Sequence, residues 1–351
     1  MNVLGLDVGG ANIKAVYLKT KNSNIVESRV KVEYFPIWKM GKDRLLPTIQ
    51  KTVFGLIGKQ KPDNVGVTMT AEVSDVYFSK VEGVSHVLSV IEKIFPRNII
   101  HVLDFEGKLL PVGKAKKSPY RVASANWMAT GWLVSRQIKN CLIVDVGSTT
   151  TSLIPIVDGK VAVKGKTDLE KLLCGELVYT GALRTNLAAI TSKVPVKNGY
   201  ASVSSEFFAA SGDVHLILGN LGKKDYTTET ADGRGKTVRE AMARIARIVC
   251  ADLNMLNKKE IIKICEYVYK KQLEQIIQAI RRVLGRLKQE AGKEKLPVVV
   301  TGMGKKFLAE EAAKRVGVRR IIDLEKIVCW EASLCTPAYG LALMVLEKFR
   351  K

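Results

Sequence analysis

Two short segments, each an apolar run that ends in an aspartate and a glycine turn, constrain this chain more than any other feature. The first runs from Leu6 to Lys14 around Asp7-Val8-Gly9-Gly10, and the second from Val144 to Thr151 around Asp145-Val146-Gly147. The apolar run before each turn predicts a buried strand, and a second strand-like run follows each turn. Glycine lets backbone N–H groups approach phosphate oxygens, and an aspartate at the same edge can hold hydrated Mg²⁺. Their repetition predicts a duplicated domain with a phosphate-bearing ligand between the halves.

Length and composition predict an ordinary globular protein of about two domains. The chain has 351 residues, of which 47% are hydrophobic, and it contains no apolar stretch of the ~18 residues that a membrane span needs. It enters a predicted strand at once, without the basic region, apolar stretch and cleavage site of a secretion signal. None of the six cysteines forms a C-x-x-C pair, so we expect reduced thiols in a cytoplasmic protein without a zinc or iron–sulfur site.

The net charge of +22 makes nucleic acid a partner that must be weighed. However, Lys and Arg are spread along the chain, and their clusters are as short as Lys114 to Lys117 and Lys258-Lys259. No recognised RNA- or DNA-binding motif accompanies them. We therefore expect a lysine-rich surface of thermophilic or salt-adapted type that attracts anionic substrates, with no nucleic-acid or membrane partner. The composition favours no particular oligomeric state.

Apolar periodicity predicts a first half in which strands alternate with helices. Strands are predicted for residues 3–7, 13–19, 25–34, 64–69 and 98–103, and helices for residues 42–60, 84–95 and 120–137. The pattern begins again near residue 140 with a strand, the second glycine turn and another strand.

The rest of the second half is predicted to be mainly helical around one further glycine turn, Gly302-Met303-Gly304. Helices are predicted for residues 236–251, 260–291 (one long or two stacked), 305–316 and 336–349, and strands for residues 296–301 and 319–323. The fold class is therefore α/β with two similar halves. Residues 1–138, joined by the closing helix 336–349, are predicted to form the first half, and residues 139–335 the second half with helical insertions.

The three glycine turns together resemble the actin, sugar kinase and Hsp70 superfamily, whose two ribonuclease H-like halves enclose a phosphate-binding cleft. Four local strings resemble more narrowly the hydantoinase/oxoprolinase-like group, and within it the archaeal condensing enzymes of methanofuran biosynthesis, which have relatives in the tetrahydromethanopterin-linked C1 pathway. These strings are Val67 to Asp75, Ala123 to Trp127, Tyr179 to Thr185 and Ala231 to Arg234. The resemblance covers nearly the whole chain.

This resemblance implies an alkyl transfer, in which an aminomethylfuran diphosphate and γ-glutamyltyramine form an aryl ether and release pyrophosphate. It implies Mg²⁺ as the cofactor and these two small molecules as partners; ATP binding stays open but is not expected. The runner-up is an ATP-dependent kinase or amide/ring hydrolase of the same fold, although the chain is much shorter than full-length oxoprolinase-type proteins. A nucleotide-switched assembly or activator protein and a basic RNA-binding protein are further alternatives.

The glycine turns supply the predicted ligand-binding residues. Asp7 and Asp145 are the predicted Mg²⁺ or Mg²⁺-water ligands, and the alternative is an aspartate that caps its own turn. Lys14 faces either a phosphate or solvent. In the superfamily, Gly302 and Gly304 approach a nucleoside, and here that pocket could be altered or unused. The predicted phosphate contacts are Gly9, Gly10, Asn12 and Lys14 in the first turn and Gly147, Ser148 and Thr149 in the second.

Glu72, Arg184 and Asp232 are the predicted catalytic residues. Glu72 follows a buried strand and could be the base for the phenol, a ligand for the aminomethyl group, or an acid at a helix N-terminus without a function. Arg184 could grip a carboxylate or the diphosphate through two bonds, or form a surface salt bridge. Asp232 could be a third acid near the metal or a plain loop aspartate. Asn126 and Trp127 could contact substrate, but a cap and a core aromatic are the ordinary alternatives.

Overall fold

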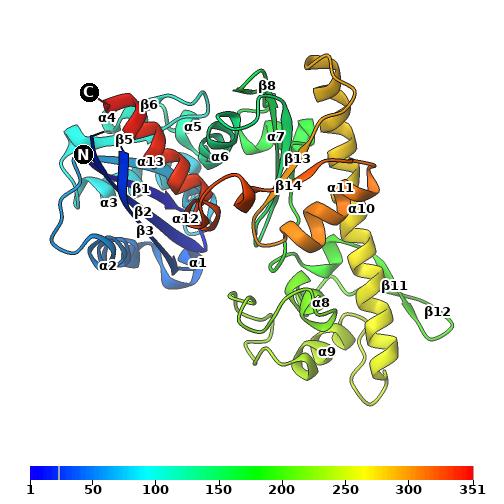
Figure 1. Cartoon of the computed structure of the whole chain (residues 1–351). Coiled ribbons are helices and arrows are strands. Elements are labelled where there is room, and N and C mark those ends of the chain that lie inside the picture. Colours follow the sequence, from blue (N-terminus) through cyan, green and yellow to red (C-terminus); the bar gives the residue numbers. More distant parts are fainter. Residues whose placement is uncertain (23, 351) are drawn as a thin grey trace. The chain divides into compact units, whose positions relative to one another are not determined.

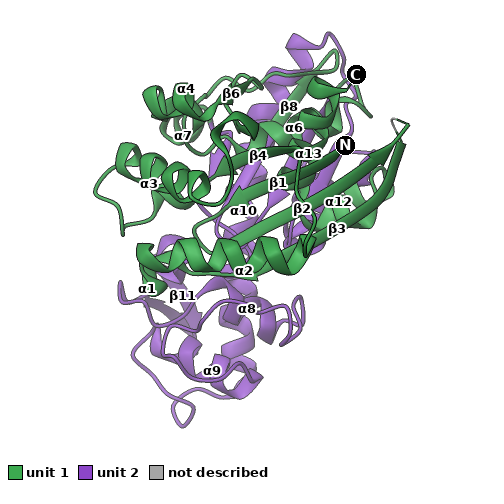
Figure 2. Ribbon diagram, turned by 90° about the vertical axis from the view of Figure 1, so that its left-hand side faces the viewer, with its two compact units in different colours: residues 1–140, 154–174, 324–351 green, residues 141–153, 175–323 purple. Residues whose placement is uncertain are grey.

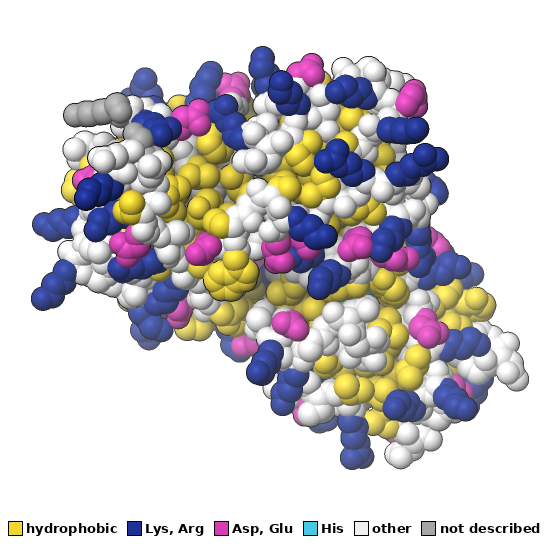
Figure 3. All heavy atoms as spheres, viewed as in Figure 1, with side chains coloured by type: hydrophobic (Ala, Val, Ile, Leu, Met, Phe, Trp, Pro, Cys, Tyr) yellow, Lys and Arg dark blue, Asp and Glu magenta, His cyan; other side chains and the backbone are white. Residues whose placement is uncertain are grey.

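The computed structural model describes residues 1–22 and 24–350, which fall into two compact units (Figure 1, Figure 2). Unit 1 consists of residues 1–140, 154–174 and 324–351, and unit 2 of residues 141–153 and 175–323. Among the described residues, none of the helices combines the length and the hydropathy that crossing a bilayer requires. On the face shown in Figure 3, Lys and Arg side chains are scattered among Asp and Glu rather than gathered in one place.

Unit 1 is built on a six-stranded mixed sheet of order β3-β2-β1-β4-β5-β6. β1, β2 and β3 pair antiparallel, β4 and β5 run parallel to β1, and β6 returns antiparallel to β5. The strands of this sheet are β1 (Asn2–Val8), β2 (Asn12–Lys21), β3 (Asn24–Tyr34), β4 (Asn64–Met69), β5 (Ile100–Leu103) and β6 (Leu109–Pro111). All five strands predicted for this half are confirmed.

Successive residues of a strand face opposite sides of the sheet, and helices of unit 1 cover both of these sides. Leu4 and Leu6 pack into a core with the apolar residues of α2 and α3, whereas Gly5 lies so close to α13 that a Cβ would be 2.2 Å from the Ala338 carbonyl oxygen. The helices of unit 1 are α1 (Ile37–Met40), α2 (Leu45–Ile57), α3 (Lys80–Glu92), α4 (Val112–Lys117), α5 (Pro119–Val122), α6 (Asn126–Ser135), α7 (Asp168–Cys174), α12 (Trp330–Leu334) and α13 (Thr336–Phe349).

The helix predicted for residues 120–137 is wrong as a single element. The helix is interrupted between α5 and α6, where Ser124 takes a left-handed backbone conformation with φ 51°. Such a conformation costs a non-glycine residue about 1–2 kcal/mol, so the surrounding structure must hold it in place. Ser124 is buried, and its side chain is committed to a partner in the candidate site.

Unit 2 repeats the same sheet order, β10-β8-β7-β13-β14, with β9 beside β8. β13 runs parallel to both β7 and β14, and β8 follows β7 through the second glycine turn. The chain passes from one unit to the other after residues 140, 153, 174 and 323, and the second of these points falls within β8. The strands of this second sheet are β7 (Cys141–Val146), β8 (Thr151–Val157), β9 (Lys160–Val161), β10 (Leu177–Val178), β13 (Val298–Thr301) and β14 (Ile321–Asp323), of which β9 and residues 154–157 of β8 belong to unit 1. Unit 2 also has a separate hairpin of β11 (Lys193–Val196) and β12 (Gly199–Ser202). The predicted duplication is confirmed by this repeated order.

The helices of unit 2 are α8 (Ser211–Ile217), α9 (Val238–Arg247), α10 (Lys258–Glu290) and α11 (Glu311–Arg315). For residues 260–291, the prediction of one long helix is confirmed over that of two stacked helices, because α10 is continuous over 33 residues. Asn257 starts it with a capping box, in which its side chain accepts from the backbone of Glu260 and the Glu260 carboxylate accepts from the Asn257 backbone. The helix predicted for residues 305–316 begins as a π-helical turn, Lys305–Glu310, before α11.

Candidate functional site

The first glycine turn, in unit 1, joins β1 to β2 as a tight hairpin. The Gly9 N–H donates to the Asn12 carbonyl oxygen at 2.9 Å, and a Cβ on Gly9 would stand only 2.7 Å from that oxygen. Asp7 lies opposite Lys14 in the strand register, and its buried carboxylate is 3.8 Å from the Lys14 ammonium. Lys14 therefore shares the side of the hairpin on which Asp7 lies. Gly10 has room around its Cα, because a Cβ there would come no closer than 3.9 Å to the Thr70 carbonyl oxygen.

The second glycine turn, in unit 2, has the same internal bond, from Gly147 N–H to the Thr150 carbonyl oxygen at 2.9 Å. A loop from Thr180 to Thr185 packs directly on it. Within that loop, the Ala182 N–H donates to the Gly147 carbonyl oxygen at 2.9 Å, and the Arg184 guanidinium donates to the Thr149 hydroxyl at 3.3 Å. Arg184 thus lies beside the second turn, as a phosphate-binding role would require.

The third glycine turn, at the end of β13, packs against the second within unit 2. Thr301 pairs with Asp145 in the parallel register, and the Gly304 N–H donates to the Val146 carbonyl oxygen at 2.9 Å. Gly302 has φ +85°, and a Cβ there would be 2.5 Å from the Asp145 carboxylate. Glycine is therefore required at position 302 both by its backbone conformation and by the closeness of Asp145.

The donor atoms at the two hairpins suit Mg²⁺. They are hard oxygens: the carboxylates of Asp7 and Asp145 at strand ends and the hydroxyls of Ser148 and Thr149. Mg²⁺ typically takes one or two carboxylates together with waters and substrate phosphates rather than a full protein cage. Within residues 1–22 and 24–350, no group of three or more His, Cys, Asp or Glu side chains is placed to hold a metal ion.

Glu72, just beyond β4 in unit 1, is a deeply buried carboxyl that is hydrogen-bonded through one of its oxygens. It is 1% exposed, and the Ser124 hydroxyl donates to its Oε1 at 2.7 Å. Its Oε2 has no hydrogen-bond partner among the described residues. Gly83 of α3 allows this burial, since a Cβ there would be 2.6 Å from the Glu72 Cα. Burial raises the pKa of Glu72 to about 7, against a smaller lowering by the Ser124 hydrogen bond and by Lys80.

Lys171 of α7 lies in the same unit, and it was not among the residues predicted from the sequence. The side chain is 1% exposed, and its ammonium stands 4.4 Å from the centre of the Trp127 ring. Trp127 is itself buried, and its indole N–H has no hydrogen-bond partner among the described residues. No motif marks Lys171 in the sequence; Ser124, by contrast, falls inside one of the strings that carried the resemblance.

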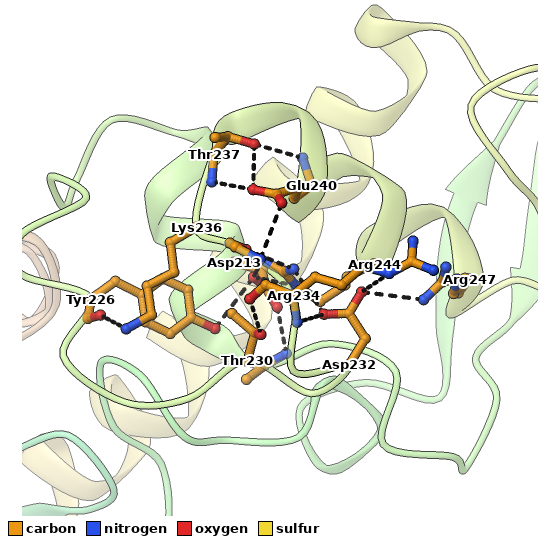
Figure 4. Close-up of polar contacts among 12 residues, drawn as sticks. Asp213, Tyr226, Thr230, Asp232, Arg234, Lys236, Thr237, Glu240, Arg244 and Arg247 are labelled. Carbon is orange, nitrogen blue, oxygen red and sulfur yellow. Dashed lines mark hydrogen bonds and ion pairs between the residues drawn. The ribbon is translucent and has the colours of Figure 1, made fainter.

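Asp232 belongs to an ion-pair network in unit 2 that holds a loop onto α8 and α9 (Figure 4). Its carboxylate accepts from Arg244 at 3.1 Å and from Arg247 at 3.3 Å, and also from the backbone N–H of Arg234. Arg244 is fully buried and forms a second ion pair with the buried Asp213 at 2.8 Å. Although partial burial raises the pKa of Asp232, the Arg234 N–H and the two guanidinium groups outweigh it and hold that pKa below its usual value.

The repeated sheet order and the glycine turns define a duplicated ribonuclease H-like α/β fold of actin-like type, which confirms the predicted fold class. Residues 63–348 match the hydantoinase/oxoprolinase family, and the chain belongs to that family. Among solved structures, a nucleotide-free acetone carboxylase, whose reaction is ATP-dependent acetone carboxylation, superimposes with a TM-score of 0.57 at 11% identity. That match covers 97% of this chain and 70% of the carboxylase chain, and it bears on the fold alone.

Two curated relatives share one enzyme name, (4-{4-[2-(gamma-L-glutamylamino)ethyl]phenoxymethyl}furan-2-yl)methanamine synthase. The protein of Methanocaldococcus jannaschii is 34% identical over 350 residues, which cover 99% of both chains. The protein of Methanococcus vannielii is 36% identical over 215 residues, which cover 60% of this chain and 94% of the relative. The narrower resemblance predicted from the sequence is thereby confirmed.

Proposed function

We propose that this chain is a transferase of methanofuran biosynthesis that joins an aminomethylfuran diphosphate to γ-glutamyltyramine in the cytoplasm of an archaeal cell. The observation that carries the proposal is the full-length relationship to the Methanocaldococcus jannaschii synthase. The name of that enzyme describes an aryl ether, in which a phenol oxygen is bonded to the CH₂ group of a furan. Such an ether divides most simply into a phenol and a furanmethyl group that carries a leaving group.

The proposed step forms one carbon–oxygen bond and breaks another, and the phenol proton passes to a base of the protein. The phenol oxygen attacks the furanmethyl carbon, the carbon–oxygen bond to diphosphate breaks, and pyrophosphate leaves with the electron pair. The electron-rich furan ring stabilises positive charge on that carbon as the bond breaks. Since the leaving group carries most of the developing negative charge, the largest contribution expected from the protein is electrostatic.

The glycine turns are the proposed diphosphate-binding elements, with backbone N–H groups and the Arg184 guanidinium as donors. Arg184 lies beside Thr149 of the second turn, which supports this assignment. Asp7 and Asp145 are the proposed Mg²⁺ ligands. When bound, Mg²⁺ would neutralise charge on the departing diphosphate.

Glu72 is the proposed general base for the phenol proton. A base works best when its pKa is close to the working pH, and burial brings the pKa of Glu72 to about 7. The Ser124 hydroxyl occupies Oε1, so Oε2 is the oxygen proposed to accept the proton. Asp232, for which the sequence left a third acid near the metal and a plain loop aspartate as alternatives, already accepts from Arg244 and Arg247, and we propose for it a supporting role in unit 2.

The test is pyrophosphate release by the purified protein with Mg²⁺ and both substrates, followed by detection of the ether product. Asp7→Asn and Asp145→Asn should each lower turnover by about a hundredfold or more, because each would remove the negative charge of a proposed metal ligand. Asp43→Asn, at an exposed position of unit 1, is the matched control and should keep full activity. In a parallel assay with ATP alone, formation of ADP without any ether product would overturn the proposal and favour the kinase or hydrolase alternative.

A further inference from the structure

Helix α7 (Asp168–Cys174) in unit 1 exposes its leucine side chains and buries a lysine side chain, which is the reverse of the usual arrangement. Leu169 and Leu173 are each 68% exposed and Leu172 is 45% exposed, whereas Lys171 is 1% exposed. A helix placed only by the hydrophobic effect would bury the leucines and leave the lysine in water. Conflicts of this kind between local pattern and packing concentrate at functional sites.

The buried ammonium of Lys171 makes one of two connections between α7 and the surroundings of Glu72, and Asp168 makes the other. On one side the ammonium lies 4.4 Å from the ring centre of Trp127 in the first turn of α6, and Ser124, three residues before Trp127, hydrogen-bonds Glu72. On the other side, Asp168 at the start of α7 forms an ion pair with Lys80 at 2.9 Å. Both Lys80 and Asp168 act electrostatically on the Glu72 carboxyl. α7 therefore brings a cation into the region where the proposed base lies.

We propose that Lys171 is a catalytic residue of the proposed reaction, and that it donates a hydrogen bond to the phenol oxygen of γ-glutamyltyramine as that oxygen loses its proton to Glu72. This inference rests on the proposed function and adds to it the group that stabilises the nucleophile. The three N–H donors of a lysine ammonium allow one to reach substrate while the others keep protein partners. The face of Trp127 attracts the ammonium and orients it.

Transfer of the phenol proton to Glu72 alone is unfavourable, so a second group is needed to stabilise the phenolate. A phenol has an ordinary pKa of about 10, so transfer of its proton to a carboxylate whose conjugate acid has a pKa of about 7 is unfavourable by about a thousandfold. A cation at the phenol oxygen offsets this deficit because it favours the phenolate over the phenol. In a buried site that effect is much stronger than it would be in water.

The first experiment compares Lys171→Met, Lys171→Arg and the control Lys166→Met, which lies in the same segment but is 57% exposed. Lys171→Met is expected to lower kcat by at least about a hundredfold, the typical cost of losing one transition-state donor. Removal of one member of a set of buried polar contacts can cost about 3–5 kcal/mol, so kcat is compared at a temperature at which every variant is shown to be folded. Lys171→Arg should retain more activity than Lys171→Met, and Lys166→Met should behave as the wild type.

The second experiment repeats the rates with ring-fluorinated γ-glutamyltyramine, whose phenol is more acidic. If Lys171 stabilises the phenolate, the defect of Lys171→Met shrinks as the phenol becomes more acidic, which a purely structural role would not produce. Wild-type turnover together with Lys171→Met activity within about threefold of it would overturn the inference and leave the proposed function standing. A Lys171→Met defect that is equal for all phenols would also overturn it. Absence of pyrophosphate release by the wild type would instead remove the proposed function, and the inference with it.

Discussion

Glu72→Gln should stabilise the folded protein at alkaline pH and leave its stability nearly unchanged at acid pH. The carboxyl has an ordinary pKa of 4.5 and a folded-state pKa raised to about 7 by burial. Between these values the folded state holds a proton that the unfolded state has released, so the free energy of unfolding falls as pH rises. At about 1.4 kcal/mol for each pH step, the total penalty above the folded-state pKa is about 3 kcal/mol. Glutamine keeps the shape of the side chain and cannot ionise, so it removes this penalty.

The assay is urea denaturation of the wild type and of Glu72→Gln at about pH 5 and about pH 8. The difference in the free energy of unfolding between the two proteins should be small at the lower pH and should approach about 3 kcal/mol in favour of the variant at the higher pH. Glu347→Gln, at an exposed position of the same unit, is the control, and its difference should hardly change between the two conditions. A difference for Glu72→Gln that is the same at both pH values would refute the argument that burial makes this carboxyl hard to ionise.

Three further predictions concern unit 2. Arg244→Met should cost about 3–5 kcal/mol in urea denaturation, because it leaves the buried Asp213 carboxylate without its cation, and adding Asp213→Asn should recover part of that loss. Gly302→Ala should destabilise by about 1–3 kcal/mol or more, since position 302 has φ +85° and the new Cβ would stand 2.5 Å from the Asp145 carboxylate; an unchanged urea midpoint would contradict this. Burial lowers the pKa of His215 to about 4. Between about pH 6.5 and pH 4 the unfolded state therefore binds a proton that the folded state does not bind, and the free energy of unfolding should fall as the pH drops through this range. His215→Gln should weaken that fall in a pH series of denaturation curves.

The strands next to the glycine turns could be predicted from the sequence because glycine turns and apolar runs are local signals. The hairpins around Asp7 and Asp145 lie where the pattern put them, and the closing helix α13 begins and ends at the predicted residues. The break at Ser124 could not be predicted in this way. Its left-handed backbone carries no glycine or asparagine signal, and it is stabilised by tertiary structure, in which Ser124 bonds a glutamate that is distant in sequence.

The role of α7 could not be predicted from the sequence for a related reason. Periodicity places apolar residues in the core, and for Leu169, Leu172 and Leu173 that rule gives the wrong face. Leaving a leucine exposed forgoes about 1.5–3 kcal/mol, and burying an ammonium costs several kcal/mol more. The folded chain must recover these costs from other contacts, such as the stacking of Lys171 on Trp127 and the ion pair between Lys80 and Asp168.

Glu72 and Asp232 show how environment separates two acids that the sequence presents as equivalent candidates. Asp232 lies between guanidinium groups that stabilise its charged form. It therefore forms ion pairs but is a poor proton acceptor near neutral pH. Glu72 is buried away from water and accepts a hydrogen bond from one hydroxyl group, so its pKa is raised to about 7. Proton transfer near neutral pH requires the second kind of environment. The hydrogen bonds around each carboxylate, which come from arginines and a serine of other elements, therefore support the proposal of Glu72 as the base. The contacts of Asp232 instead hold α9 and the loop before it in place.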